Sequence, residues 1–130
     1  MSLTDSNSSI KGVIITDKKL IQIYDNWQDK LDADEWYFSK SFEAISKDMS
    51  SEVAFNYIPE VVNVLLELDE DYLIWATLYF LMDLYRIAET TELHPALEKN
   101  WSVLREHIQK YEDSYSTPYQ ELRRLLRVKN

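Results

Sequence analysis

The residues of this 130-residue chain best suited to catalysis or metal binding are its two histidines, His94 and His107. An imidazole titrates near neutral pH, so it can act as a general acid or base or as a metal ligand. Neither histidine has the Glu-x-x-His or His-x-x-x-His spacing that places two ligands on one helix face. We therefore expect structural roles, with His94 in a link before Pro95 and His107 on a mostly solvated helix face.

Carboxylates are abundant, and one group has the alternating spacing of a calcium-binding loop. Glu67, Asp69 and Asp71 occupy every second position, but an EF-hand loop also needs a glycine at its sixth position and a glutamate at its twelfth. The one glycine is Gly12, and the twelfth position counted from Glu67 is Leu78. Acids at this place are better explained as the start of a helix, where the helix dipole favours them.

The lack of cysteine and the near lack of glycine exclude further chemistries. Without cysteine there is no disulfide scaffold, thiolate metal site or cysteine nucleophile. Phosphate-binding loops and nucleophile elbows need several glycines, and the chain has one. We therefore expect no catalytic residue, no bound metal and no cofactor, and we do not expect an enzyme.

Asp83 lies inside an apolar segment and has two interpretations. It precedes Arg86 by three residues, so the two can pair on the single hydrated stripe of a helix. Alternatively, it belongs to a small-molecule or catalytic site, which would need a cavity lined by Asp83, Tyr79 and His107. The ion pair is the favoured interpretation.

The acidic excess of the chain is confined to its middle. Residues 31–72 hold eleven acids and two bases, whereas acids and bases balance in residues 1–30 and 73–130, so the middle accounts for the full formal charge of −9. Concentrated charge speeds encounter with an oppositely charged partner and repels nucleic acid and anionic membranes. We predict a basic protein partner, such as a toxin or nuclease, without direct binding of nucleic acid or membrane.

Aromatic residues lie beside the acids at two predicted helix starts. Residues 34–38, Asp-Glu-Trp-Tyr-Phe, place three consecutive rings after two acids, and successive helical residues point about 100° apart. If Phe38 faces the core, Trp36 or Tyr37 must be partly exposed, as interface anchors often are, although Trp36 could equally pack on a neighbouring helix. The predicted partner-binding residues are Asp32, Asp34, Glu35, Trp36, Tyr37, Glu67, Asp69, Glu70, Asp71 and Tyr72.

The elements that position these residues are predicted to be helices. Tight hairpins need residues that tolerate positive φ, so a single glycine argues against a multi-stranded sheet. Apolar residues recur at steps of three and four over 20–31, 38–49 and 58–66. Asp17 is placed to cap the first of these helices, and Pro59 suits the first turn of the third.

The second half of the chain continues this pattern. Residues 72–82 are apolar on nearly all sides, which is typical of a buried central helix, within a segment from about Glu70 to Ala88 that Asp69 would cap. Pro95 begins the next helix, and Thr117 is placed to cap the last one. We predict an all-α fold of about six antiparallel helices, arranged as an irregular bundle or a HEAT-like stack of helical hairpins.

The chain is expected to form one domain in the cytoplasm. The predicted helical domain covers residues 13–130, with residues 13–16 as either a short strand or the start of a helix, and residues 1–12 form a disordered N-terminal segment. The apolar run at 72–82 is shorter than the roughly 20 residues that span a bilayer, and residues 2–9 are too polar for a signal peptide.

Three features of the central region also occur in known helical proteins. They are the helix start Tyr57-Ile58-Pro59-Glu60, the apolar helix with Trp75, and the link of residues 90–93, Thr-Thr-Glu-Leu. In this layout the chain resembles HEAT-like helical hairpins and small acidic helical immunity proteins of bacterial toxin–immunity systems. The resemblance implies a cytoplasmic protein that binds and blocks a cognate toxin, and it implies no catalytic residue.

Two functions are consistent with these patterns. The preferred hypothesis is a non-enzymatic inhibitor, an immunity or antitoxin-like protein whose acidic and aromatic face blocks a basic site on a toxin. The alternative is a helical scaffold or adaptor protein whose acids are only a solvated face. A scaffold would bind through apolar patches, and its complex would be insensitive to salt.

Overall fold

The computed structural model describes residues 17–111 and 117–128, which contain α-helices and no strand. The all-α prediction is confirmed, whereas the predictions for residues 1–12 and 13–16 lie outside the described residues. The described residues form seven helices: α1 (Lys18–Tyr24), α2 (Trp27–Ala33), α3 (Tyr37–Ser46), α4 (Ser51–Glu67), α5 (Asp71–Ala88), α6 (Pro95–Tyr111) and α7 (Thr117–Leu126).

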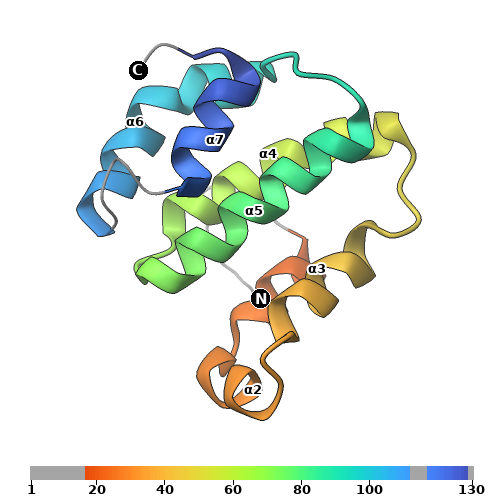
Figure 1. The fold of residues 1–130 in the computed structure, drawn as a ribbon, viewed down its shortest axis with the longest axis vertical. Helices are drawn as coiled ribbons and strands as arrows, with labels where there is room; N and C mark the ends of the chain where they lie inside the picture. Colours follow the sequence, from red (N-terminus) through yellow and green to blue (C-terminus); the bar gives the residue numbers. More distant parts are fainter. Residues whose placement is uncertain (1–16, 112–116, 129–130) are drawn as a thin grey trace, which may run out of the picture.

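The helices form a bundle of three layers (Figure 1). The middle layer is α4 and α5, which pack extensively on each other. On one side α6 covers α4 and α7 covers α5, and on the other side lie α1, α2 and α3, with α3 against α5. The HEAT-like stacking of antiparallel hairpins is not confirmed.

Helix α5 is the buried centre of the bundle, as its composition predicted. Eleven of its eighteen residues are buried, and Ile74, Leu78 and Leu84 expose no surface at all. Burying one such aliphatic side chain stabilises the fold by about 1.5–3 kcal/mol. The helix therefore makes a large contribution to the core, and only a narrow stripe of it reaches solvent.

The N-terminal region forms two helices where one was predicted. The break falls at Asp25–Asn26, where Asn26 has φ 52° in the left-handed region. Asparagine tolerates this conformation better than most residues. The apolar periodicity did not reveal the break because Tyr24 and Trp27, on either side of it, both still pack against the core. The predicted count of six helices is therefore not confirmed.

Helix α4 begins about two turns before the predicted start. The Ser50 side chain caps it by accepting a hydrogen bond from the Val53 N–H at 3.2 Å. Pro59 therefore lies inside the helix, and the prediction that it occupies a first turn is wrong. Proline has no N–H to donate to the carbonyl of Phe55, but fully buried neighbours such as Ile58 hold the helix in place.

The predicted caps of α5 and α7 are wrong by one residue, whereas the predicted role of His94 before α6 is confirmed. The cap position of α5 is Glu70 rather than Asp69, and Thr117 is the first residue of α7 rather than its cap. His94 has the structural role that was predicted. Its Nδ1 accepts a hydrogen bond from the Ala96 N–H at 3.0 Å, directly before the proline that begins α6.

Polar contacts attach helix α1 to the middle layer at both of its ends. At its C-terminal end, the Tyr24 hydroxyl is hydrogen-bonded to the hydroxyl of the fully buried Thr77 at 2.6 Å. At its start, Asp17 donates its N–H to Glu60 Oε1 at 2.8 Å and accepts a hydrogen bond from the Tyr57 hydroxyl at 2.9 Å. Burial raises the pKa of both tyrosines, so both hydroxyls keep their protons.

The Glu60 carboxyl makes the stability of this contact depend on pH. Burial raises its pKa, the hydrogen bond from the Asp17 N–H lowers it, and the nearby Asp17 carboxylate raises it, with a net upward shift. The folded state therefore binds this proton more tightly than the unfolded chain does. The stability that Glu60 contributes is fully present below the ordinary glutamate pKa of about 4.3 and is lost as the pH rises through the raised folded pKa.

Replacing Glu60→Gln keeps the acceptor oxygen and removes the titration. Relative to wild type, the free energy of unfolding of this variant should increase as the pH rises from about 4 to about 7, measured by urea denaturation at several pH values. Glu52→Gln removes an exposed carboxylate from the same helix and serves as the control. A difference between Glu60→Gln and wild type that stays constant with pH would contradict this prediction.

Glu89 ends α5 in the left-handed conformation, with φ 58° and ψ 39°. A Cβ atom is disfavoured there by about 1 kcal/mol, and an acid at a helix C-terminus opposes the dipole. We expect Glu89→Gly to raise the free energy of unfolding by about 0.5–1 kcal/mol in urea denaturation. Asn26→Gly, at φ 52°, should raise the free energy of unfolding by less, because asparagine already tolerates this region. An equal gain at both positions would show that left-handed strain is not the cause.

Candidate functional site

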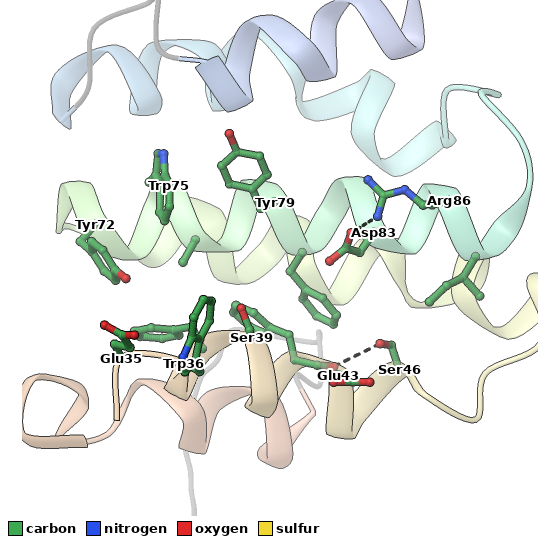
Figure 2. Close-up of a pocket in the computed structure, with 15 residues that line it drawn as sticks. Glu35, Trp36, Ser39, Glu43, Ser46, Tyr72, Trp75, Tyr79, Asp83 and Arg86 are labelled. Atoms are coloured by element: carbon green, nitrogen blue, oxygen red, sulfur yellow. Dashed lines mark hydrogen bonds and ion pairs between the residues drawn. The ribbon is translucent and has the colours of Figure 1, made fainter. Parts of the chain in front are cut away.

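A groove lies between α3 and α5, where the N-terminal layer meets the middle layer (Figure 2). Its volume of about 730 Å³ falls within the roughly 300–1,000 Å³ of ligand-binding clefts. Helices α3 and α5 begin at the same end of the groove, since Trp36 and Tyr72 lie at one end and Ser46 and Arg86 at the other. The two helix starts that the sequence singled out therefore meet at one site.

One wall of the groove comes from α3 and the residues just before it. It presents Glu35, Trp36, Ser39, Glu43 and Ser46, which from Trp36 onward follow helical steps of three and four. Trp36 is 59% exposed, and both glutamates are exposed. The wall therefore combines a large apolar ring with two solvated carboxylates.

The other wall is the least buried stripe of α5. It presents Tyr72, Trp75, Tyr79, Asp83 and Arg86, again at steps of three and four. Tyr72 is 38% exposed and Trp75 is 39% exposed, although most of this helix is buried. Asp83 and Arg86 form the predicted ion pair, in which the guanidinium donates to the carboxylate.

Buried aromatic rings form the floor of the groove. Phe42 of α3 and Phe80 of α5 stack with centroids 4.4 Å apart, and both side chains belong to the core. At the end where the helices begin, Tyr72 stacks on Trp27 of α2 at 5.8 Å and lies 5.7 Å from Phe38. Aromatic pairs of this kind each contribute about 0.5–1.5 kcal/mol beyond area burial, so the floor is rigid.

The aromatic rings are concentrated at one end of the groove, whereas both ends carry an acid. The aromatic side chains Trp36, Tyr72 and Trp75 gather with Glu35 at the end where the helices begin, whereas Glu43 and Asp83 lie toward the other end. Three acids and one base line the groove, and the base is already paired with Asp83. Its chemistry therefore favours a ligand that offers apolar groups and positive charge.

The structure brings three of the ten predicted binding residues, Glu35, Trp36 and Tyr72, into this groove. Two others have partners within the protein. Tyr37 is half-buried and donates its hydroxyl proton to the carbonyl of Ile23 at 2.7 Å. Asp34 pairs with Lys40 at 2.9 Å, and this hydrogen bond lowers the pKa of its carboxyl.

The remaining five predicted residues are exposed acids outside the groove, at the end of α2, the end of α4 and the connection into α5: Asp32, Glu67, Asp69, Glu70 and Asp71. Glu43 and Trp75 were not predicted as site residues, whereas Tyr79 and Asp83 were named only for the alternative small-molecule or catalytic site. The helical spacing from Tyr72 through Trp75 and Tyr79 to Asp83 was the available signal, because it marks one stripe of an otherwise apolar helix.

His107 lies away from the groove. Its Nε2–H donates to the carbonyl of Leu68 at 2.5 Å, and its ring lies 5.2 Å from that of Tyr111. His107 therefore has the structural role that was predicted, and its side chain is half-buried on a helix face that also carries the exposed residues Val103 and Lys110. The alternative small-molecule site needed one cavity lined by Asp83, Tyr79 and His107. The groove is lined by Asp83 and Tyr79 but not by His107.

Within residues 17–111 and 117–128, no group of three or more histidine, aspartate or glutamate side chains is placed to hold a metal ion. None of the helices in these ranges has both the length and the apolar character needed to cross a membrane.

The chain was also compared with known proteins. No protein-family model, no curated protein and no solved structure matches it. The geometry and chemistry of the groove are therefore the basis for assigning a function.

Proposed function

We propose that this protein is a non-enzymatic binding protein that holds a basic partner protein in the groove between α3 and α5. By covering that partner's basic site, it would act as an inhibitor of the immunity or antitoxin kind. One observation carries the proposal: two partly exposed tryptophans, Trp36 and Trp75, share a groove with the exposed acids Glu35 and Glu43.

The groove offers both parts of a typical interface. Tryptophan and tyrosine bury a large area with little loss of side-chain freedom, and such anchors often account for about 2 kcal/mol or more of binding free energy. A lysine or arginine over a tryptophan face gains about 0.5–2 kcal/mol as water is excluded. The nearby carboxylates would steer a basic partner to the groove and fix its position there.

The acids of the groove are better suited to binding than to catalysis. Glu35 and Glu43 are exposed, and Asp83 is paired with Arg86. None of the three has the buried setting in which enzymes tune a carboxylic acid for proton transfer. This supports a binding protein over an enzyme.

The electrostatic part of the proposal predicts a groove-specific effect of charge reversal. Wild-type protein immobilised on beads should capture a basic partner from extracts of its native cells at low salt and lose it as salt is added. The double variant Glu35→Lys/Glu43→Lys should bind the identified partner about tenfold or more weakly in calorimetry. Its main effect should be slower association.

A matched control separates the groove from overall charge. Glu52→Lys/Glu98→Lys changes the net charge equally at exposed positions on α4 and α6, outside the groove. It should bind the partner as wild type does, apart from a small loss of long-range attraction. Equal loss in both variants would reject the groove as the site, and a complex insensitive to salt would favour the scaffold alternative.

The inhibitory role makes a separate prediction. Expression of the captured partner alone should arrest cell growth, and co-expression with this chain should restore growth. The Glu35→Lys/Glu43→Lys variant should restore growth less well than the Glu52→Lys/Glu98→Lys control, because it binds the partner more weakly. A partner that is harmless when expressed alone would support the scaffold or adaptor function instead.

A further inference from the structure

We infer that the groove between α3 and α5 accepts one amphipathic α-helix of the partner, with apolar side chains along one face and lysine or arginine beside it. The inference rests on the proposed function and specifies which kind of structural element enters the groove.

The walls have the length and regularity of a seat for a helix. On α5, the wall from Tyr72 to Arg86 extends about 21 Å at the helical rise of 1.5 Å per residue. On α3, the wall from Trp36 to Ser46 extends about 15 Å by the same rise. A partner helix of three to four turns covers this length, and its side chains can fit between side chains that follow the same helical spacing.

An extended peptide is a poorer occupant for a physical reason. A strand binds mainly by pairing its backbone N–H and C=O groups with the free edge of a sheet. Both walls here are α-helices, whose backbone groups are hydrogen-bonded along their own axes. The groove therefore offers side chains rather than backbone partners, which is how an amphipathic helix is recognised.

The order of side chains along the groove specifies the partner's pattern. Trp36, Tyr72 and Trp75 form an aromatic end, which suits leucine, phenylalanine or methionine together with the stem of a long basic side chain. Glu35 also lies at this end, and Glu43 lies toward the other end near the Asp83–Arg86 ion pair, so each end offers one exposed glutamate to a lysine or arginine head. The partner helix should carry its apolar residues toward the aromatic end.

Charge distinguishes this occupant from two others. A second copy of the chain carries a formal charge of −9 and would bring acids to an acidic groove. Residues 1–16 of the same chain contain one aspartate and one lysine, so they bring no net positive charge. A basic helix from another protein is the occupant that complements the groove.

The test uses the full chain and three synthetic peptides of about 18 residues, long enough for five helical turns. The first places leucine and lysine at helical spacing, with leucine on one face. The second has the same composition in strict alternation, which suits a strand, and the third is the first with glutamate in place of lysine. Binding is followed by the indole N–H signals in NMR spectra, with Trp101, on α6 outside the groove, as the internal reference for Trp36 and Trp75.

We expect the helical leucine–lysine peptide alone to bind, to become helical, and to shift the signals of Trp36 and Trp75. Equal binding of the alternating peptide would overturn the inference that the groove accepts a helix, but it would not contradict the proposed function. Equal binding of the glutamate peptide would overturn charge complementarity, and with it the proposed function. Binding of no peptide would overturn the inference, while the partner-capture experiment would still judge the proposed function by itself.

A substitution in the groove wall tests whether the helical peptide binds in the groove rather than elsewhere on the surface. Trp36→Ala should raise the dissociation constant of the helical peptide about tenfold or more. Val103→Ala, on α6 outside the groove, should leave it unchanged; the two side chains are 59% and 56% exposed, so neither substitution should unfold the protein, as circular dichroism will verify. An unchanged affinity for Trp36→Ala would overturn the inference.

Discussion

The burial of α5 against α4 is the interaction on which the rest of the structure depends. Helix α5 carries apolar side chains on nearly every side, so it is stable only when other elements cover it. Helix α4 covers one side, α7 another, and α3 a third. One wall of the groove is the stripe of α5 that these neighbours leave uncovered. Its large aromatic side chains therefore belong to a helix that is otherwise buried in the core.

The N-terminal layer fixes the shape of that opening. The hydroxyl pair of Tyr24 and Thr77 and the stack of Phe42 on Phe80 join this layer to α5. Because Thr77 is fully buried, removing the Tyr24 hydroxyl would leave the Thr77 hydroxyl unpaired in apolar surroundings at a cost of about 1–3 kcal/mol. The width of the groove is therefore set by contacts within the folded protein, and a partner would meet a preformed site.

Sequence patterns predicted the parts of the fold that depend on strong local signals. The apolar segment of α5 and the proline at the start of α6 indicated both helices within a residue or so. The break at Asn26 and the early start of α4 were not predicted. In the first case the apolar spacing continues across the break, and in the second Pro59 suggested a first turn although tertiary packing holds it inside the helix.

The candidate site was predicted only in part, for a similar reason. Trp36 and Tyr72 stood out because each lies beside a cluster of acids at a helix start. Glu43 did not, because its role comes from the packing of α3 on α5, which residue spacing within one helix does not specify. Trp75 has no acid beside it, and only its helical spacing from Tyr72 marked it. Four of the eleven acids of residues 31–72 lie at 67–71, yet these four are outside the groove.

The division of the groove into a buried floor and exposed walls has an evolutionary consequence. Phe42 and Phe80 of the floor belong to the core, so substitutions there change the stability of the whole protein. Trp36 and Trp75 of the walls contribute less to the core, since each keeps more than a third of its surface exposed. A lineage of such proteins could therefore change the ligand that it recognises by substituting wall residues, one at a time, while the fold stays constant.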